Sequence, residues 1–302
     1  MDCLLVITGP TGVGKTELTL RLAERFGCPV VSADSRQIYR EIPIGTAAPT
    51  ADELTRVKHY FVGTKSVTED YSAGQYERDA LEVLKDLPFA ILTGGSMMYI
   101  DAVCKGFDDI PSVSADVRQA VRNGYKTGGR AWLQQEVERM DGDYWAHVDR
   151  QNPQRLMHCL EVTLSAGKPY STFRRQAQAK REFEIVKVGL ERSREELYER
   201  INRRVDAMLA AGLEDEARRV YPLREHNSLQ TVGYRELFDY FDGKTTREEA
   251  IRLIKQNSRH YAKRQMTWFR ADKTIHWLNA DMDYEEQMDN IMAWLRAGGM
   301  QQ

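Results

Sequence analysis

Several features are missing from this 302-residue sequence, and the absences exclude some classes of protein. No run of 18 or more apolar residues occurs, which excludes a transmembrane helix and a membrane partner. The opening MDCLLVITGP has neither a basic stretch nor a cleavage site, so we expect no secretory signal and a cytoplasmic protein. The sequence contains no internal repeat and no low-complexity segment.

Cysteine is scarce, and the spacing of the cysteines differs from that of a metal-binding motif. The four cysteines, Cys3, Cys28, Cys104 and Cys159, are far apart, and no Cys-x-x-Cys occurs. This spacing predicts free thiols in a reducing compartment and argues against a zinc site.

The sequence also lacks a strong overall charge, because its net charge is only −2. The charged residues are nevertheless unevenly distributed along the chain. Residues 110–182 carry a net charge of +4 and residues 244–273 carry +6. Residues 1–109, 183–243 and 274–302 carry −5, −3 and −4. The two basic blocks are either solvated helix faces or a surface for a polyanion such as a nucleic acid.

The arrangement of apolar segments predicts an α/β fold. Hydrophobic content of 42% and charged content of 29% are ordinary for a globular protein, and the length allows one large domain with an insertion or two domains. Strands are expected at residues 3–8, 29–35, 59–63, 88–96, 183–190 and 274–278, and helices follow the first strand up to Gly27 and cover 73–86. Strands alternating with helices predict a parallel sheet.

The pattern changes after about residue 110, where helical periodicity and basic residues replace the strands. We therefore expect a P-loop parallel-sheet core formed by residues 1–110 and 183–302, with C-terminal helices, and a helical insertion at 111–182. Within the core, Ser193 and Glu196 form a capping-box pattern. It predicts a helix with Leu197, Ile201, Val205 and Leu209 on one side.

The first motif that carries chemistry is Gly9-Pro10-Thr11-Gly12-Val13-Gly14-Lys15-Thr16, which matches G-x-x-x-x-G-K-[ST]. It follows a predicted strand and opens a predicted helix, as a phosphate-binding loop must. Glycines allow backbone N–H groups to turn toward phosphate oxygens, and the helix N-terminus adds its dipole. Lys15 supplies a positive charge, and the Thr16 hydroxyl can ligate Mg²⁺. The motif predicts phosphate binding but does not by itself identify a nucleotide such as ATP as the ligand.

The acid of a hydrolysing P-loop enzyme is absent. Such enzymes carry an aspartate at the end of an apolar strand, where it helps to hold Mg²⁺. The corresponding strand here ends in Thr93-Gly94-Gly95-Ser96. This difference weakens an interpretation as an NTPase.

Three further groups of residues have both a functional and a purely structural interpretation. Asp34 ends the second predicted strand, where a carboxylate is well placed to act as a general base, or else serves as a helix cap or turn residue. Arg200 and Arg204 share one helix face and suit phosphate binding, or else are solvated.

The third group is residues 259–270, where basic and aromatic residues alternate. The basic residues are Arg259, His260, Lys263, Arg264 and Arg270, and the aromatic residues are Tyr261, Trp268 and Phe269. Such a stretch either binds RNA, with aromatics stacked on unpaired bases, or has its aromatics in the core and its charges in solvent.

Taken together, eight motifs in a fixed order resemble those of the bacterial tRNA dimethylallyltransferases, also called tRNA isopentenyltransferases. The motifs are GPTGVGKT, SADSRQIYREIPIGTAAPT, YSAGQYERDA, LTGGSMMYI, NPQRLMHCLEV, LYERINRRVDAML, QTVGYREL and KRQMTWFR. The resemblance spans nearly the whole chain, from residue 9 to about residue 278. One motif alone would be weak, but eight in order are specific.

The resemblance implies a prenyl transfer. The family moves a dimethylallyl group from dimethylallyl pyrophosphate to the exocyclic amine of the adenosine just 3′ of the anticodon, in tRNAs that read codons beginning with U. It implies that the phosphate loop holds the donor's pyrophosphate with Mg²⁺ on Thr16, which explains the missing acid. The partners would be dimethylallyl pyrophosphate and the anticodon stem-loop, whose stem the insertion would grip. Nothing demands an oligomer, and we expect a monomer.

The resemblance also implies roles for individual residues. Asp34 matches the base, Lys15 a catalytic cation, and Ser96 stands where the family usually has threonine. Residues Gly9 to Thr16 together with Arg200 and Arg204 would bind pyrophosphate. The residues expected to contact tRNA are Asp34, Ser35, Arg36, Gln37, Ser96, Arg118, Gln154, Arg155, Leu156, Met157, His158, Gln230, Thr231, Val232, Gly233, Tyr234, Arg235, Lys263, Arg264 and Arg270. His158 replaces an arginine that some relatives have.

Three other functions remain as alternatives at this point. A P-loop kinase for a small molecule would need ATP and a phosphate acceptor. An enzyme that prenylates free adenine nucleotides would have little use for the two basic blocks. A non-enzymatic RNA-binding protein would not need the intact Lys15, Thr16 and Asp34.

Overall fold

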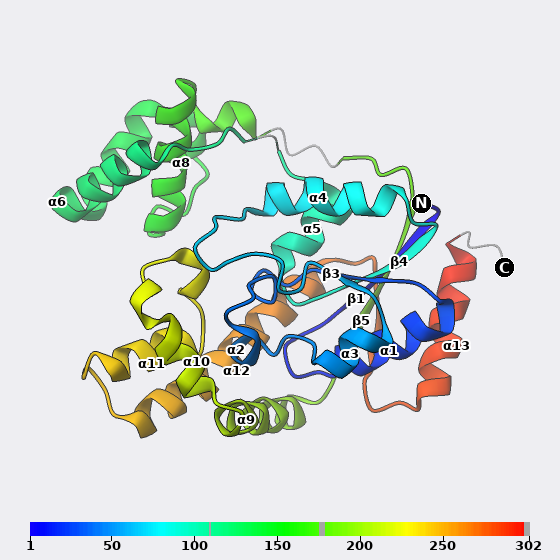
Figure 1. Cartoon of the computed structure of the whole chain (residues 1–302). Coiled ribbons are helices and arrows are strands. Elements are labelled where there is room, and N and C mark those ends of the chain that lie inside the picture. The colour runs from blue at the N-terminus through cyan, green and yellow to red at the C-terminus, as the bar shows by residue number, and fades with distance from the viewer. Residues whose placement is uncertain (109, 175–178, 299–302) are drawn as a thin grey trace. The chain divides into compact units, whose positions relative to one another are not determined.

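The computed structural model describes residues 1–108, 110–174 and 179–298. Six parallel strands form one sheet in the order β3-β2-β4-β1-β5-β6 (Figure 1). Their bounds are β1 Cys3–Thr8, β2 Val30–Ser32, β3 His59–Tyr60, β4 Phe89–Thr93, β5 Glu184–Glu191 and β6 Ile275–Asn279. The predicted parallel α/β core is confirmed, with strands at all six expected places.

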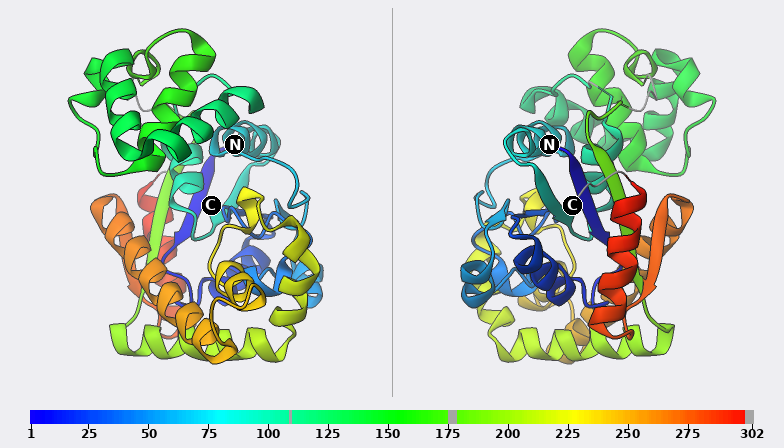
Figure 2. Two further views of the ribbon diagram at one scale, coloured as in Figure 1. Left: turned by 90° about the vertical axis from the view of Figure 1, so that its left-hand side faces the viewer. Right: turned by 90° about the vertical axis from the view of Figure 1, so that its right-hand side faces the viewer.

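The sheet is covered on both faces because the residues of each central strand alternate between two cores. In β1, Leu5 and Ile7 belong to one apolar cluster, whereas Leu4 and Val6 belong to another. The first cluster includes residues of α1 (Lys15–Phe26) and α13 (Tyr284–Ala297), and the second includes residues of α4 (Ala73–Lys85) and α5 (Met97–Lys105). The right-hand view of Figure 2 shows α1 and α13 on the same face. Complete burial of β1 explains its continuous apolar sequence.

The core also contains six further α-helices among the described residues. They are α2 Pro43–Thr46, α3 Ala51–Arg56, α9 Arg194–Ala210, α10 Leu213–Val220, α11 Tyr234–Phe241 and α12 Arg247–Ala271, with short 3-10 helices at Tyr221–Leu223 and Asn227–Leu229. Residues of α9 to α12 form a third apolar cluster with Ile38 and Ile42.

β2, β3 and β4 are shorter than expected, since β4 spans only Phe89–Thr93, and for β2 and β3 the reason is local. β2 ends at Ser32 because the chain turns at Asp34, whose Oδ1 accepts from Arg36 N and Gln37 N. β3 ends at Tyr60, because Phe61 has a φ of 63°, which no strand residue adopts. Both departures occur at the edge of the sheet where β2 and β4 end.

The helix at α9 begins at the expected place, but only half of the expected capping box forms. The Ser193 side chain accepts from Glu196 N at 3.2 Å. The Glu196 carboxylate instead pairs with Arg192 at 2.7 Å. Ionic pairing with a nearby arginine therefore replaces the bond from Glu196 back to the Ser193 N–H.

By its internal contacts the chain divides into two compact units, which we call the core unit (Met1–Lys105 and Lys180–Gln302) and the insertion unit (Gly106–Ala179). We had expected the insertion at 111–182. Arg181 belongs to the core unit because its guanidinium donates to Val103 O and Ala102 O at the end of α5, and pairs with Glu77.

Within its described residues the insertion unit contains helices and no strand. They are α6 Ala115–Met140, α7 Gly142–Trp145, α8 Pro153–Ala166 and a 3-10 helix at Tyr170–Phe173, with α6 interrupted at Gly129. Its core contains a buried carboxylate, Asp141, which accepts from Ser171 N at 2.7 Å and from Ser171 Oγ at 2.6 Å.

None of the helices in the described ranges is both long enough and apolar enough to cross a membrane. The four cysteines are all buried, and none forms a disulfide.

Candidate active site

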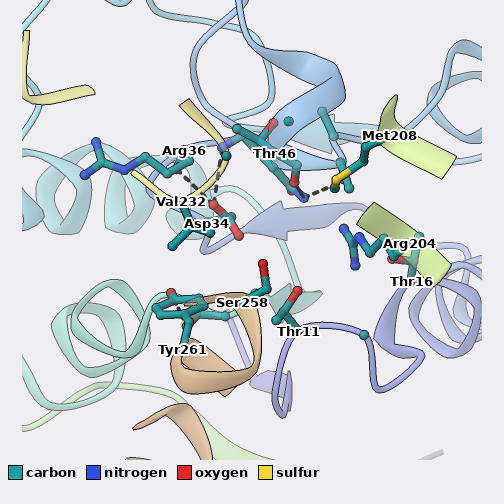
Figure 3. Close-up of a pocket in the computed structure, with 18 of the residues that line it drawn as sticks. Thr11, Thr16, Asp34, Arg36, Thr46, Arg204, Met208, Val232, Ser258 and Tyr261 are labelled. Carbon is teal, nitrogen blue, oxygen red and sulfur yellow. Dashed lines mark hydrogen bonds between the residues drawn. The ribbon is translucent and has the colours of Figure 1, made fainter. Parts of the chain in front are cut away.

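A cavity of about 1110 Å³ opens in the core unit where β1, β2 and β4 end (Figure 3). The segments that follow these three strands contribute Thr11, Asp34 and Ser96 to its lining, and α9 and α12 form much of the rest. Figure 3 shows Asp34 and Ser258 pointing into this space, with Arg204 and Thr16 at one end. The carboxyl ends of parallel strands are the usual location of a ligand site in such sheets.

The phosphate-loop motif forms the expected strand–loop–helix unit between β1 and α1. Glycine is required at Gly9, where φ is 140° and a Cβ would lie 2.7 Å from Leu190 O. It is equally required at Gly12, where φ is 82° and a Cβ would lie 2.9 Å from a methylene carbon of Ile201. The loop is therefore packed tightly against β5 and α9, which fixes the direction of its backbone N–H groups.

Lys15 lies against the loop that it belongs to. Its Nζ donates to Gly9 O at 2.9 Å and to Pro10 O at 3.0 Å. The pKa of Lys15 is lowered to about 7, mainly by burial and also by the positive charge of Arg204, while Asp34 opposes the shift. An anion bound beside Lys15 would favour the charged ammonium, so the site is poised to take up phosphate.

The two arginines of α9 enter the site, which rules out a freely solvated face. Arg200 donates from Nε to Gly12 O at 2.9 Å and so binds the phosphate loop directly. Arg204 makes no hydrogen bond or ion pair with the described residues, and burial lowers its pKa while Asp34 opposes the shift. A guanidinium without a partner at the end of a cavity is a ready ligand for a phosphate group.

Asp34 forms the turn that its position suggested, and its role as a base stays a prediction. Its Oδ1 accepts from Arg36 N at 2.9 Å and from Gln37 N at 3.3 Å, which fixes the turn after β2. Its Oδ2 has no hydrogen-bond partner among the described residues. One oxygen thus orients the carboxylate, and the other remains available as an acceptor in the cavity.

Ser96 connects the segment after β4 with the segment after β2. Its Oγ accepts from Ser35 N at 2.8 Å and donates to Ser35 Oγ at 3.0 Å, and its own N–H donates to Ala33 O at 3.2 Å. Gly94 packs so closely that a Cβ there would overlap Ala33 O. Ser96 therefore holds the backbone on both sides of Asp34.

A further part of the lining comes from the stretch Gln230 to Arg235. All its members except Tyr234 line the cavity. Tyr234 is completely buried, and its hydroxyl donates to Glu216 Oε1 at 2.5 Å, so its side chain offers no surface to an RNA. Arg36 and Gln37, which follow Asp34 in the sequence, also line the cavity, and the Gln37 side chain donates to Ala47 O at 2.9 Å.

The basic and aromatic stretch 259–270 lies in α12, and its aromatic residues have different environments. Phe269 is buried in the core and is not available for stacking. Tyr261 lines the cavity, and Trp268 is exposed and donates to Asp101 at 3.2 Å. Of the two interpretations left open by the sequence, burial in the core therefore holds for Phe269, whereas Tyr261 and Trp268 stay accessible.

The basic residues of α12 also differ from one another in their exposure and contacts. Lys263 is exposed, and Arg264 lines the cavity with its guanidinium 5.7 Å from the ring centre of Tyr261. Arg270 pairs with Glu191 at 3.0 Å but keeps a large exposed fraction. A contact of these three residues with tRNA stays a prediction.

The expected tRNA-contacting residues of the insertion unit lie on α6 and α8. Gln154 and Arg155 occupy the exposed first turn of α8, and Arg118 lies in the first turn of α6. Leu156 is completely buried in the core of this unit, so its side chain has a packing role. His158 is exposed and packs its ring against Tyr170, with 5.4 Å between ring centres.

Two residues that hold the loops of this site, Gln265 and Arg192, were not predicted from the sequence. Gln265 and Tyr261 bind the segment before Ser96, and Arg192 donates from Nε to Val13 O at 2.9 Å. One signal was available for Gln265, because Ala262, Gln265 and Phe269 share a helical face and all three are buried. A glutamine in such an apolar stripe requires polar partners.

The donor set suits a magnesium ion that is held mainly by substrate. Thr16 lines the cavity, and its hydroxyl has no hydrogen-bond partner among the described residues. No group of three or more histidine, cysteine, aspartate or glutamate residues that could hold a metal occurs in the described part of the chain. Mg²⁺ commonly binds through few protein oxygens, several waters and the phosphates of a substrate, so Thr16 fits one position of such a site.

Comparison with known proteins gives concordant matches. The family model described as IPP transferase matches residues 37–272. The chain is 55% identical over 284 residues to tRNA dimethylallyltransferase 2 of Porphyromonas gingivalis, and 52% identical over 285 residues to tRNA dimethylallyltransferase 2 of Parabacteroides distasonis. Each alignment covers 93% of this chain and 95% of the relative.

A solved structure resembles the whole chain as well. It is the full-length tRNA isopentenylpyrophosphate transferase of Bacillus halodurans, with a TM-score of 0.71 and 34% sequence identity. The match covers 99% of this chain and 97% of that one.

Proposed function

Since the chain belongs to the IPP transferase family and is a tRNA dimethylallyltransferase, a prenyltransferase, we propose how its cavity performs the transfer. The donor is dimethylallyl pyrophosphate. The acceptor is the exocyclic amine of the adenosine 3′-adjacent to the anticodon, in tRNAs that read codons beginning with U. The observation that carries this proposal is that a phosphate loop and an aspartate oxygen without a partner line the same cavity.

The phosphate loop is proposed to hold the leaving pyrophosphate. When the bond between the allylic carbon and the bridging oxygen breaks, negative charge grows on pyrophosphate. Lys15, Arg204 and the N–H groups at the start of α1 supply positive charge at that place. Such preorganised charge stabilises a developing anion strongly in a site that excludes water.

Asp34 is proposed to be the base. The adenine amine is a poor nucleophile because its lone pair is delocalised into the ring. As its nitrogen forms a bond to the allylic carbon, the amine must lose one proton, and Asp34 Oδ2 is the available acceptor. The turn that holds Oδ1 keeps the carboxylate aimed at the cavity.

Magnesium is proposed as the metal, with Thr16 as its protein ligand. When bound, it would neutralise charge on the pyrophosphate and so improve the leaving group. The protein's own contribution is to present the Thr16 hydroxyl beside Lys15 at the first turn of α1.

The acceptor adenosine has to leave its stacked position in the anticodon loop to enter the cavity. The proposed contacts to it come from Asp34 to Gln37, Ser96 and the Gln230–Arg235 stretch, all of which contribute to the same lining. The exposed cations of α12 and of the insertion unit are proposed to bind tRNA phosphates. The substrate also places the enzyme where tRNA is found, in the cytoplasm, and a monomer suffices for the proposed contacts.

A kinase-like use of the loop is less well supported. β4 pairs directly with β1, and its last residue is Thr93, whose hydroxyl donates to Ile7 O at 3.1 Å. In the described part of the chain, the end of β4 therefore lacks the carboxylate with which a P-loop NTPase holds its metal.

The proposal is tested by offering the purified protein labelled dimethylallyl pyrophosphate and Mg²⁺ with either tRNA or free AMP. Label is expected in tRNA and not in AMP. Label in AMP alone would contradict the proposed acceptor, and ADP formation from ATP with a small acceptor would support a kinase instead.

A further inference from the structure

One side chain connects the loop proposed to hold the donor with the segment that holds the base. Gln265 of α12 is only 1% exposed, although it carries a polar amide. Its Oε1 accepts from Thr11 N at 2.9 Å, and its Nε2 donates to Gly95 O at 2.7 Å. A buried amide is costly unless its groups are paired, and here both ends are paired with backbone from different loops.

The connection continues from Gly95 to Asp34. Gly95 precedes Ser96, whose Oγ accepts from Ser35 N at 2.8 Å and whose N–H donates to Ala33 O. These contacts lie on both sides of Asp34 in the sequence. A continuous series of hydrogen bonds therefore runs from the phosphate loop, through Gln265, to the backbone that carries Asp34.

The close fit around Gln265 indicates that this arrangement is specific. A Cβ at position 95 would overlap the Gln265 amide nitrogen, so only glycine allows the amide to come this near. Tyr261, one turn earlier on the same helix, donates to the same Gly95 O at 3.3 Å. Two side chains of α12 thus hold one carbonyl at the cavity wall.

We propose that Gln265 is a positioning residue that sets the distance between the phosphate loop and the Asp34 segment. This inference rests on the proposed function, in which the loop holds the leaving group and Asp34 removes the proton from the acceptor. Transfer requires the breaking and forming bonds to be aligned, and a misplacement of about 1 Å can reduce the rate about 10²-fold. Gln265 acts through the two loops, so its loss affects turnover more than binding of either substrate.

Two substitutions of Gln265 remove either both of its hydrogen bonds or only the one to Gly95 O. Gln265→Met has similar volume and removes both hydrogen bonds. Gln265→Glu keeps an acceptor for Thr11 N but loses the donor to Gly95 O. Both variants are expected to lower kcat by about 10²-fold, whereas the Kd values for pyrophosphate and for tRNA stay within a few fold of the wild type.

Tyr261→Phe keeps Gln265 and removes only the longer of the two bonds to Gly95 O. Its kcat is therefore expected to fall less than that of either Gln265 variant. The ratio of kcat to the two Kd values is the readout, because a purely structural role would reduce the number of active molecules and lower binding capacity together with turnover.

Gln287 provides the matched control. It is a buried glutamine of α13 whose Nε2 donates to Met282 O at 3.0 Å, and it does not line the cavity. Gln287→Met is expected to lower the melting temperature without changing kcat. Wild-type kcat in Gln265→Met, or an equal loss of kcat in Gln287→Met, would overturn the inference. Failure of the wild type to prenylate tRNA would instead overturn the proposed function, so the two failures are distinct.

Discussion

At the scale of single residues, the two oxygens of Asp34 have separate tasks. Asp34→Asn keeps an Oδ1 acceptor for Arg36 N and Gln37 N, so the turn should survive, but it removes the base. We expect kcat to fall by about 10²-fold or more while tRNA affinity is retained. Single-turnover label transfer and a tRNA binding assay measure the two quantities.

Asp34→Ala removes the turn as well as the base and is the comparison variant. It is expected to lose at least as much turnover as Asp34→Asn and to be less stable. Turnover by Asp34→Asn at the wild-type rate would remove Asp34 from the mechanism.

Lys15 makes the stability of the ligand-free protein depend on pH. Its pKa is about 7 in the folded protein and 10.5 is its ordinary value, so the unfolded chain binds more protons between these values. Stability should therefore rise with pH in that window, by at most about 1.4 kcal/mol per pH unit from this one group. The measurement is the difference in the free energy of unfolding between wild type and Lys15→Met at several pH values from about 7 to 9.

Lys15→Met cannot titrate, so the wild type is expected to gain stability relative to it as the pH rises. If the difference in the free energy of unfolding between wild type and Lys15→Met stays constant over this range, the pKa of Lys15 is not lowered in the folded protein.

At the scale of helices, a buried carboxylate holds one wall of the cavity in place. Glu216 of α10 is completely buried and accepts from Ile44 N at 2.9 Å, Gly45 N at 2.8 Å and the Tyr234 hydroxyl. These bonds satisfy the first N–H groups of α2, whose end lines the cavity. Glu216→Gln places an amide NH₂ against N–H donors, and we expect it to cost about 2–4 kcal/mol of stability in urea unfolding.

Tyr234→Phe is the milder companion, because it removes one donor and leaves the carboxylate bonded to α2. Its cost should stay below about 1.5 kcal/mol. A cost for Glu216→Gln no larger than that for Tyr234→Phe would contradict this account of α2.

The same scale shows what the sequence could and could not predict. The phosphate loop, the places of the strands along the chain and the turn at Asp34 follow from local patterns, because a glycine loop between a strand and a helix has few possible geometries. The role of Gln265 depends on Thr11, which is 254 residues away, and no local pattern encodes that approach.

Two further outcomes, at Glu196 and Phe269, have a similar cause. Glu196 was expected to bond back to the start of its helix, but Arg192, which itself binds the phosphate loop, takes its carboxylate. For Phe269 the sequence left stacking on RNA and burial in the core open, and packing places it in the core on the same helical face as Ala262 and Gln265. In both cases a tertiary contact decided between two locally reasonable interpretations.

At the scale of the whole molecule, the uneven charge predicts how tRNA binding responds to salt. The chain has a net charge of −2, but residues 110–182 and 244–273 carry +4 and +6. If these blocks neutralise about four tRNA phosphates, affinity should fall by about 10²-fold between roughly 50 and 200 mM salt. Titrations at several KCl concentrations measure the slope, and a flat response would contradict an RNA surface at the basic blocks.

The central claim is that one cavity joins a phosphate loop holding the leaving pyrophosphate to a base acting on a tRNA adenosine. The most direct measurement incubates the protein with tRNA, dimethylallyl pyrophosphate and Mg²⁺. It quantifies released pyrophosphate and N6-dimethylallyl adenosine in the digested tRNA. We predict equal amounts of the two products, with the modified adenosine immediately 3′ of the anticodon. Pyrophosphate release without modified adenosine, or modification that consumes ATP instead of the allylic donor, would contradict the account.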